Sequence, residues 1–155
     1  MKRIFLSNKE IALIDDEDYN LVKDVKWFPS DGYAYRSKSI KYPHGIMMHR
    51  LIMNVTNSKL DVDHINGNRL DNRKKNLRVC SRAENLHNSK KHKDNKSGYK
   101  GVYKHTQGKW CALIMSEGKR HYLGVFVDKE EAAKAYDAAA IKLHGKFAKL
   151  NMKKA

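Results

Sequence analysis

The stretch from Asp63 to Asn88 constrains the fold of this chain more than any other segment. It reads DHINGNRLDNRKKNLRVCSRAENLHN, in which two short apolar runs flank an Asn-Gly turn signal and a basic, Asn-rich loop. Ser81 and Glu84 have the spacing of a capping box and predict the start of a helix that reaches about Lys91. The stretch therefore predicts strand, loop, strand and helix in that order. The predicted strands cover residues 62–65 and 77–80.

Charge predicts the kind of partner. The 155 residues have a formal net charge of +15, which a fold does not need and which indicates an acidic polymer, with nucleic acid as the first candidate. The excess is uneven, because residues 15–31 hold six acids and two lysines, whereas residues 66–125 hold fifteen lysines or arginines and four acids. We expect the polyanion to meet the middle and later parts of the chain.

Several classes of protein do not fit the sequence. No apolar run approaches the roughly 18 residues that span a bilayer, and the N-terminal apolar segment is too short for a secretory signal, so we expect a soluble, intracellular protein without a membrane partner. Cys80 and Cys111 are too few for a thiolate zinc site and are predicted to be small core residues without a disulfide.

The first 56 residues predict a β-rich scaffold. Apolar runs at 3–6 and 11–14 flank a polar four-residue connection and predict a hairpin, after which Asp15 or Asp16 is expected to cap a short helix that Pro29 stops. His49 lies on an apolar segment and is interpreted first as a structural histidine, with a contact to DNA or to an active site as the alternative. Two further strands and a short helix are predicted at 32–36, 46–48 and 49–53.

The polar positions of the central stretch resemble the HNH endonucleases, a family with a ββα-metal fold. His64, Asn76 and Asn85 match the three defining positions, with separations of 12 and 9 residues, and Asp63 directly precedes the first. These spacings resemble the Asn-ending branch found in phage and intron-encoded homing enzymes, and the resemblance covers roughly residues 57–93. A final Asn in place of His departs from the family name.

The resemblance implies how a phosphodiester bond would be cleaved, which requires an activated water and neutralisation of charge in the transition state. It implies that His64 is the general base, a role that suits imidazole near neutral pH. It implies that Asp63 and Asn85 ligate one divalent ion, Mg²⁺ or alternatively Mn²⁺, since both supply hard oxygen donors. Asn76 is expected to hold the loop so that His64 keeps its orientation.

The loop between the two predicted strands is basic. We expect its cations to grip DNA phosphates and so position the scissile bond. The alternative is that the Asn and Asp residues of this stretch simply form an ordinary solvated, turn-rich loop. The cations expected to contact DNA phosphates are Arg69, Arg73, Lys74 and Lys75.

The last third of the chain predicts a three-stranded antiparallel sheet and one helix. Strands are expected at 99–105, 109–116 and 119–126, and Asp128 with Glu131 predicts a capped helix that ends at Gly145. Residues 98–151 resemble the plant ethylene-response-factor (APETALA-type) DNA-binding domain. The motifs that carry this resemblance are Lys100-Gly101-Val102, Gly108-Lys109-Trp110, Tyr122-Leu123-Gly124-Val125-Phe126, the helical run from Glu131 to Ala139, and Leu150-Asn151.

This second resemblance implies that the sheet reads the major groove, with Trp110, Ala112 and Ile114 facing the helix and the other face meeting DNA. The plant pattern has arginines where Tyr103, His105 and Met115 stand and tryptophans at Gln107 and Tyr122, so its target sequence does not carry over. The expected DNA-facing positions are Lys100, Tyr103, His105, Gln107, Lys109, Met115, Arg120 and Tyr122.

The sequence thus predicts an α+β protein, in which a β-rich scaffold (1–56) leads into a ββα-metal core (57–93), a linker (94–98) and a sheet-and-helix DNA-binding domain (99–151). The predicted function is a metal-dependent, homing-type endonuclease that acts on double-stranded DNA as a monomer or homodimer, in the bacterial cytoplasm if it is phage-encoded. A DNA-binding regulator with an inactive HNH module and an RNA-binding accessory protein are the two alternatives.

Overall fold

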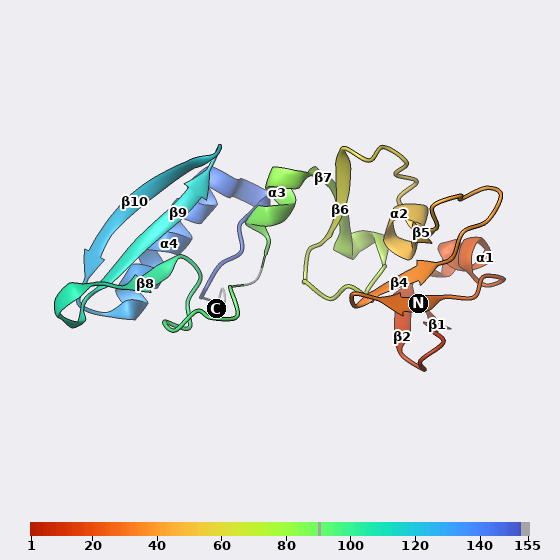
Figure 1. Ribbon diagram of the computed structural model, residues 1–155, viewed down its shortest axis with the longest axis horizontal. Coiled ribbons are helices and arrows are strands. Elements are labelled where there is room, and N and C mark those ends of the chain that lie inside the picture. The colour runs from red at the N-terminus through yellow and green to blue at the C-terminus, as the bar shows by residue number, and fades with distance from the viewer. Residues whose placement is uncertain (90, 153–155) are drawn as a thin grey trace. The chain divides into compact units, whose positions relative to one another are not determined.

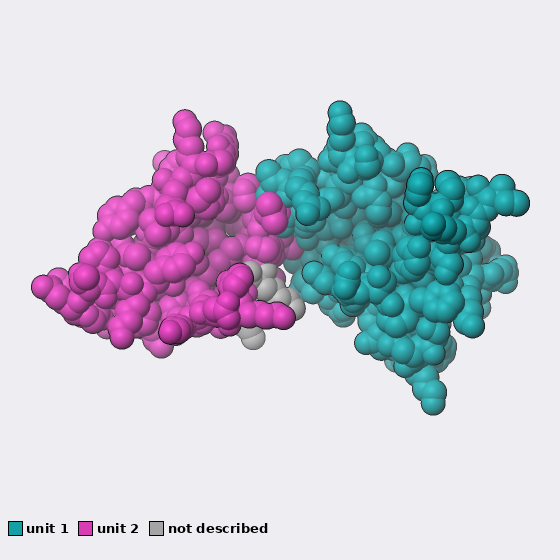
Figure 2. Space-filling view, in the orientation of Figure 1, with its two compact units in different colours: residues 1–85 teal, residues 86–155 magenta. Residues whose placement is uncertain are grey.

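The computed structural model describes residues 1–89 and 91–152. The chain forms two compact units, Met1–Asn85 and Leu86–Ala155 (Figures 1 and 2). Helices and small antiparallel sheets make up both units, which confirms a mixed α and β protein. The division falls within one helix, and the domain limits expected at 93 and 99 stay a prediction. No helix in the described part of the chain has the length and apolar character needed to cross a bilayer.

Unit 1 begins with the predicted hairpin, in which β1 (Lys2–Phe5) pairs antiparallel with β2 (Ile11–Ile14). A second sheet has the order β3-β4-β5 and is followed directly by a helix. Its elements and the short helices of this part are η1 (Asp16–Asp18), α1 (Tyr19–Val22), β3 (Phe28–Ser30), β4 (Tyr33–Arg36), β5 (Ile46–Met47) and α2 (Met48–Ile52).

Two expectations for this region are wrong in detail. Pro29 does not stop the helix, because α1 already ends at Val22 and Pro29 lies inside β3, an edge strand where a missing N–H is tolerated. The side chain of Asp15 does not cap the helix that follows it. Its carboxylate instead accepts a hydrogen bond at 2.8 Å from the backbone N–H of Lys74, which lies far along the chain in the loop that follows His64.

The central stretch forms the predicted order of elements. β6 (Leu60–His64) pairs antiparallel with β7 (Leu77–Ser81), and α3 (Arg82–His87) follows at once. The capping box is confirmed, because the Glu84 carboxylate accepts bonds from the backbone N–H and hydroxyl of Ser81, and the hydroxyl accepts one from the N–H of Glu84.

The end of α3 differs from the expectation of about Lys91. The helix ends at His87, and the ammonium of Lys100 donates to the carbonyl oxygens of His87 and Ser89 at 2.7 and 2.8 Å. A cation at these carbonyls satisfies acceptors that a longer helix would have used. Lys90, which the expected helix included, lies outside the described residues.

The core of unit 1 joins the scaffold to the β6–β7 hairpin. Trp27, Ile14, Met48 and Val22 are fully buried in a cluster that also contains the inward side chains of β6 and β7. The indole N–H of Trp27 donates to the carbonyl oxygen of Val22 at 3.0 Å, so the largest core residue carries no unsatisfied donor. Cys80 is buried, as expected.

Unit 2 contains the predicted sheet and helix. β8 (Val102–Lys104), β9 (Trp110–Ser116) and β10 (Lys119–Phe126) form one antiparallel sheet in the order β10-β9-β8, and α4 (Lys129–His144) ends at Gly145 as expected. α4 covers one face of this sheet (Figure 1). Alanines let the helix lie close, because Ala112 packs with Ala132 and Ala133, while Ile114 packs with Tyr136 and Ala140.

Two details of unit 2 correct the sequence interpretation. Asp128 occupies the N-cap position without a side-chain cap bond, and the acids of the first turn, Glu130 and Glu131, supply the negative charge that a helix start favours. Cys111 is not a core residue. It is half-buried and lies directly opposite Tyr103 in the register, on the sheet face away from the helix.

Gly101 provides a sharp test of the close packing in unit 2. Its φ is +73°, and a Cβ there would stand 2.1 Å from Tyr136 Cδ2 and 2.6 Å from the carbonyl oxygen of Leu113. Gly108 has the same φ but open space at that position, so Gly108→Ala is a matched control. We expect Gly108→Ala to lower the unfolding free energy by about 1–2 kcal/mol and Gly101→Ala by about 1–3 kcal/mol more. Equal losses of unfolding free energy in Gly101→Ala and Gly108→Ala, measured by urea unfolding, would contradict the close packing at Gly101.

Candidate active site

The alternation of β6 separates the candidate site into two faces. Asp61 and Asp63 lie on one face of the strand, and Val62 and His64 on the other, because successive side chains of a strand point to opposite sides. His64 is the last residue of β6, at the mouth of the loop that leads to β7. The expected general base and the adjacent expected metal ligand therefore have different neighbours.

Asn72 fixes the orientation of the His64 ring. The His64 Nε2 and Asn72 Oδ1 atoms are 3.1 Å apart, and the Asn72 Nδ2 donates to the carbonyl oxygen of Leu70 at 3.3 Å. Because Asn72 uses its amide nitrogen elsewhere, its oxygen accepts and His64 Nε2 must carry the proton. In the neutral ring, Nδ1 then holds the lone pair. Both residues are buried, and Asn72 is 0% exposed.

Burial lowers the pKa of His64 from its ordinary value, while the hydrogen bond that His64 donates to Asn72 and the charges of Asp63 and Asp71 act in the opposite direction. A lowered pKa keeps the imidazole uncharged at neutral pH. An uncharged imidazole is the form that accepts a proton, so the environment of His64 suits a general base.

Two aromatic rings from the scaffold pack on His64. Its ring centroid lies 5.0 Å from that of His49 on α2, with an edge-on angle of 73°, and 5.8 Å from that of Tyr33 on β4. His49 and Tyr33 are themselves 5.0 Å apart. The interpretation of His49 as a purely structural residue is incomplete, and Tyr33 had no signal beyond its strand pattern.

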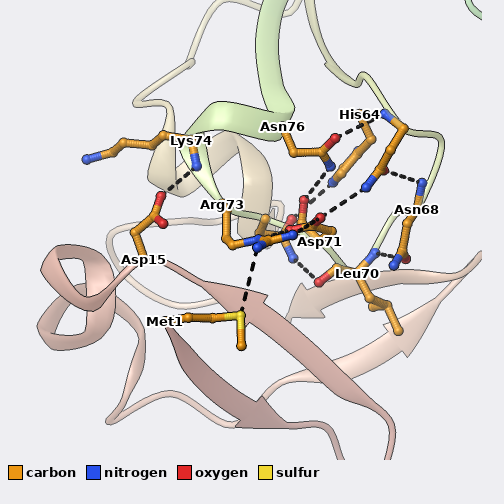
Figure 3. A network of polar contacts seen from close by, with 11 residues as sticks. Met1, Asp15, His64, Asn68, Leu70, Asp71, Arg73, Lys74 and Asn76 are labelled. Carbon is orange, nitrogen blue, oxygen red and sulfur yellow. Dashed lines mark hydrogen bonds and ion pairs between the residues drawn. The ribbon is translucent and has the colours of Figure 1, made fainter. Parts of the chain in front are cut away.

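Asn76 holds the two ends of the loop together. Its Nδ2 donates to the carbonyl oxygen of Asp71 at 2.8 Å, its Oδ1 accepts from the backbone N–H of Asn66 at 3.0 Å, and its carbonyl oxygen accepts from the N–H of Ile65 (Figure 3). These bonds fix the backbone that directly follows His64. The geometry is that of a loop clamp, and the role that the HNH resemblance implies for Asn76, keeping His64 oriented, stays a prediction.

The loop itself is anchored to the hairpin at the start of the chain. Leu13 on β2 donates its N–H to the carbonyl oxygen of Leu70 and accepts the N–H of Asn72, both at 2.8 Å. Asp71 and Asn72 are 2% and 0% exposed, and the Arg73 guanidinium binds both oxygens of the Asp71 carboxylate at 2.7 Å (Figure 3). A merely solvated loop does not bury such residues, so that alternative reading is wrong.

The four basic residues of the loop have different surroundings. Arg73 pairs with Asp71, and Lys74 pairs with Glu17 and Asp18, which places two of the expected phosphate-binding cations next to carboxylates. Arg69 donates to the carbonyl oxygen of Asp31 at 2.6 Å and stacks over Tyr33. Lys75 is exposed. Contact of these residues with DNA stays a prediction.

The expected metal ligands lie on the other face of β6. Asp63 pairs with Arg78, its direct neighbour across the strands, and the Nδ2 of Asn85 donates to Asp61 at 2.8 Å. Two carboxylates and one amide oxygen are hard donors that fit Mg²⁺. No group of three His, Cys, Asp or Glu side chains within residues 1–89 and 91–152 could hold a metal ion.

The expected DNA-facing residues of unit 2 divide into two groups. Lys100 is half-buried, and its ammonium binds the carbonyl oxygens at the end of α3. Tyr103, Met115 and Tyr122 are 53%, 51% and 62% exposed, and the register places them on the sheet face away from α4. The other exposed members are His105, Gln107, Lys109 and Arg120. Their contact with DNA also stays a prediction.

The first unit holds a histidine in a fixed orientation on a β-hairpin that is followed by a helix. The second unit holds an antiparallel sheet with a helix on one face. These two features define a chain that combines an HNH-type module with a sheet-type DNA-binding domain. Comparison with known families agrees. The HNH endonuclease family matches residues 47–87, and the AP2 domain family matches residues 97–146.

Known proteins resemble both parts. An uncharacterised HNH endonuclease of Acanthamoeba polyphaga mimivirus is 30% identical over 147 residues, which cover 90% of this chain and 74% of the viral protein. Dehydration-responsive element-binding protein 2D of Arabidopsis thaliana is 52% identical over 56 residues, or 35% of this chain and 27% of the plant protein. A putative AP2/ERF and B3 domain-containing protein of Oryza sativa subsp. japonica is 46% identical over 55 residues, or 36% and 17%.

The chain belongs to the HNH endonuclease family and carries an AP2-type domain at its C-terminal end. It spans about three quarters of the viral relative but less than a third of either plant protein. The HNH match begins at residue 47, so it includes α2 and His49. Sequence reasoning assigned that helix to the scaffold.

Asn72 should be the loop residue whose loss costs most stability. Asn72→Ala leaves the buried Nε2–H of His64 without its acceptor and opens a cavity, which we expect to lower the unfolding free energy by about 1–3 kcal/mol. Lys75→Ala, three residues away and exposed, is the control and should lie within about 0.5 kcal/mol of the wild type. Urea unfolding measures both. If Asn72→Ala lowers the unfolding free energy no more than Lys75→Ala does, the hydrogen bond between Asn72 and His64 does not stabilise the loop.

His49 should make stability depend on pH. Burial, followed by the nearby charges of His64 and Arg50, lowers the pKa of His49 from 6.5 to about 3. Between those values the unfolded chain binds a proton that the folded chain does not, so the unfolding free energy should rise with pH across this window. His49→Phe should have a flatter curve than the wild type in urea unfolding at a series of pH values. Parallel curves would show that folding leaves the His49 pKa unchanged.

Proposed function

We propose that this protein is a metal-dependent, homing-type endonuclease that hydrolyses phosphodiester bonds of double-stranded DNA. The observation that carries the proposal is His64, a buried, uncharged histidine whose ring orientation Asn72 fixes, at the end of a strand that also bears Asp63. Membership of the HNH endonuclease family supports the same function. The β6–β7–α3 order supports a ββα-metal arrangement, with Asp63 and Asn85 as the metal ligands.

His64 is assigned the proton-transfer step. With its Nε2–H bound to Asn72, the ring offers the Nδ1 lone pair to a water molecule, takes one proton from it and becomes an imidazolium. The hydroxide so formed attacks the phosphorus, the bond to the leaving oxygen breaks, and the leaving oxygen takes a proton from solvent water. Asn76 supports this step indirectly, because its clamp fixes the loop that directly follows His64.

The other face of β6 is assigned to charge neutralisation. Asp63 and Asn85 would hold a divalent ion there, with Asp61 next to Asn85. When bound, such an ion supplies positive charge for the phosphate oxygens and the leaving oxygen in the transition state. Arg78 holds Asp63 in a buried pair and brings a second cation to the same face.

The AP2-type sheet is assigned the choice of target. Its exposed face carries aromatic, apolar and basic side chains that could reach base edges and phosphates in the major groove. The strongly basic composition outside residues 15–31 supports attraction to any duplex. We therefore assign binding energy to both units and site preference mainly to unit 2.

One observation favours a second candidate. The close pair between Asp63 and Arg78 already satisfies a carboxylate that the enzyme needs for a metal ion, which would suit a DNA-binding regulator that has lost cleavage. The two candidates differ in whether divalent ions produce cut DNA.

The decisive experiment is cleavage of a random-site duplex library with Mg²⁺ or Mn²⁺, followed by sequencing of the cut ends. We expect the wild type to cut a limited set of sites and His64→Ala to be slower by about 10²–10⁴-fold, because it lacks the general base. His92→Ala removes an exposed histidine and is the matched control. Tight binding of the library without any metal-dependent cut would favour the regulator.

A further inference from the structure

His49 is a buried histidine that the proposed mechanism does not yet use. It lies on α2 in the scaffold part of the chain, and only 7% of its surface is exposed. Its Nδ1 is buried and has no hydrogen-bond partner among the residues that the structure describes. A buried polar atom without a partner costs stability, so this nitrogen does not stabilise the fold, and the contribution of His49 must come from the contacts of its ring.

The surroundings of His49 point to His64. The two rings are 5.0 Å apart with an edge-on angle of 73°, an arrangement in which the positive edge of one ring meets the electron-rich face of the other. Tyr33 stands 5.0 Å from His49 and 5.8 Å from His64, so the three rings contact one another in a closed group. Asn72 binds the remaining, polar side of His64.

We propose that His49 is a positioning residue for His64. The rings of His49 and Tyr33 together form an aromatic wall that keeps the His64 ring in its hydrogen bond with Asn72. This deepens the proposed function and rests on it. Asn72 by itself fixes one atom of the His64 ring and leaves rotation about that hydrogen bond open. Contacts from two rings remove this freedom, and a general base must be held in orientation to act well.

The electrostatics of the pair agree with this role. Burial lowers the pKa of His49 to about 3, so this ring stays uncharged at neutral pH. An uncharged neighbour does not repel the imidazolium that His64 becomes on taking a proton, and an aromatic face attracts it. A lysine or arginine at the same place would oppose the proton transfer.

The test compares three variants of the full chain. His49→Ala removes the wall, and His49→Phe keeps a ring without its nitrogens. Leu51→Ala is the matched control, because Leu51 is a buried core residue of the same helix but does not belong to the group of three rings. The first readout is the ¹⁵N NMR spectrum of the His64 ring in the metal-free protein. The others are the single-turnover cleavage rate and the affinity for duplex DNA.

We expect one His64 tautomer, with the proton on Nε2, in the wild type, His49→Phe and Leu51→Ala, and a mixture in His49→Ala. The cleavage rate should fall by about 10²-fold in His49→Ala, a typical cost of a misplaced catalytic group. His49→Phe should stay close to the wild type, and all four proteins should bind DNA equally.

Three results would overturn the positioning role. One is an unchanged His64 tautomer in His49→Ala. Another is a rate for His49→Ala no lower than that of Leu51→Ala. The third is a loss of rate or DNA affinity in His49→Phe as large as in His49→Ala, which would mean that a ring nitrogen of His49 acts directly. Failure of the wild type to cut would instead refute the proposed function, and the NMR comparison would still decide the position of His64.

Discussion

The candidate site depends on one short contact between backbone segments far apart in the sequence. Leu13 on β2 uses both its N–H and its carbonyl oxygen to bind the loop at Leu70 and Asn72. Each such bond contributes only about 0.5–1.5 kcal/mol, but together they bring Asn72 to the ring of His64. The hairpin at the start of the chain is therefore part of the framework of the candidate site.

Charge within unit 1 is balanced locally in spite of the basic composition. The acidic segment after β2 supplies Glu17 and Asp18 to Lys74, and the loop supplies Asp71 to Arg73. These carboxylates fix the loop bases in defined positions and reduce their charge. The positive potential that attracts DNA must then come largely from other residues, which include the exposed Arg69 and Lys75 and the bases of unit 2.

Local patterns in the sequence predicted the elements well, because capping residues, turns and alternating apolar residues act over a few positions. The Ser81–Glu84 box and the three strands of unit 2 are examples. Contacts between distant segments were not predictable in the same way. Nothing in the alternation around Tyr33 or on the helix of His49 indicates that both rings reach His64, and Asn72 resembles any loop asparagine. The end of α3 was not predictable in this way either, because Lys100, thirteen residues further on, binds the carbonyl oxygen of the last helical residue, His87.

The composition of the outer sheet face affects how binding would respond to ionic strength. Lysines and arginines release counterions when they meet phosphates, which makes affinity fall steeply as salt is added. Tyr103, Met115 and Tyr122 are exposed on this face and carry no charge. Contacts made through them would survive added salt, whereas attraction through the rest of the basic surface would fade. Raising the salt concentration would thus shift the balance from general attachment to the discrimination that the sheet provides.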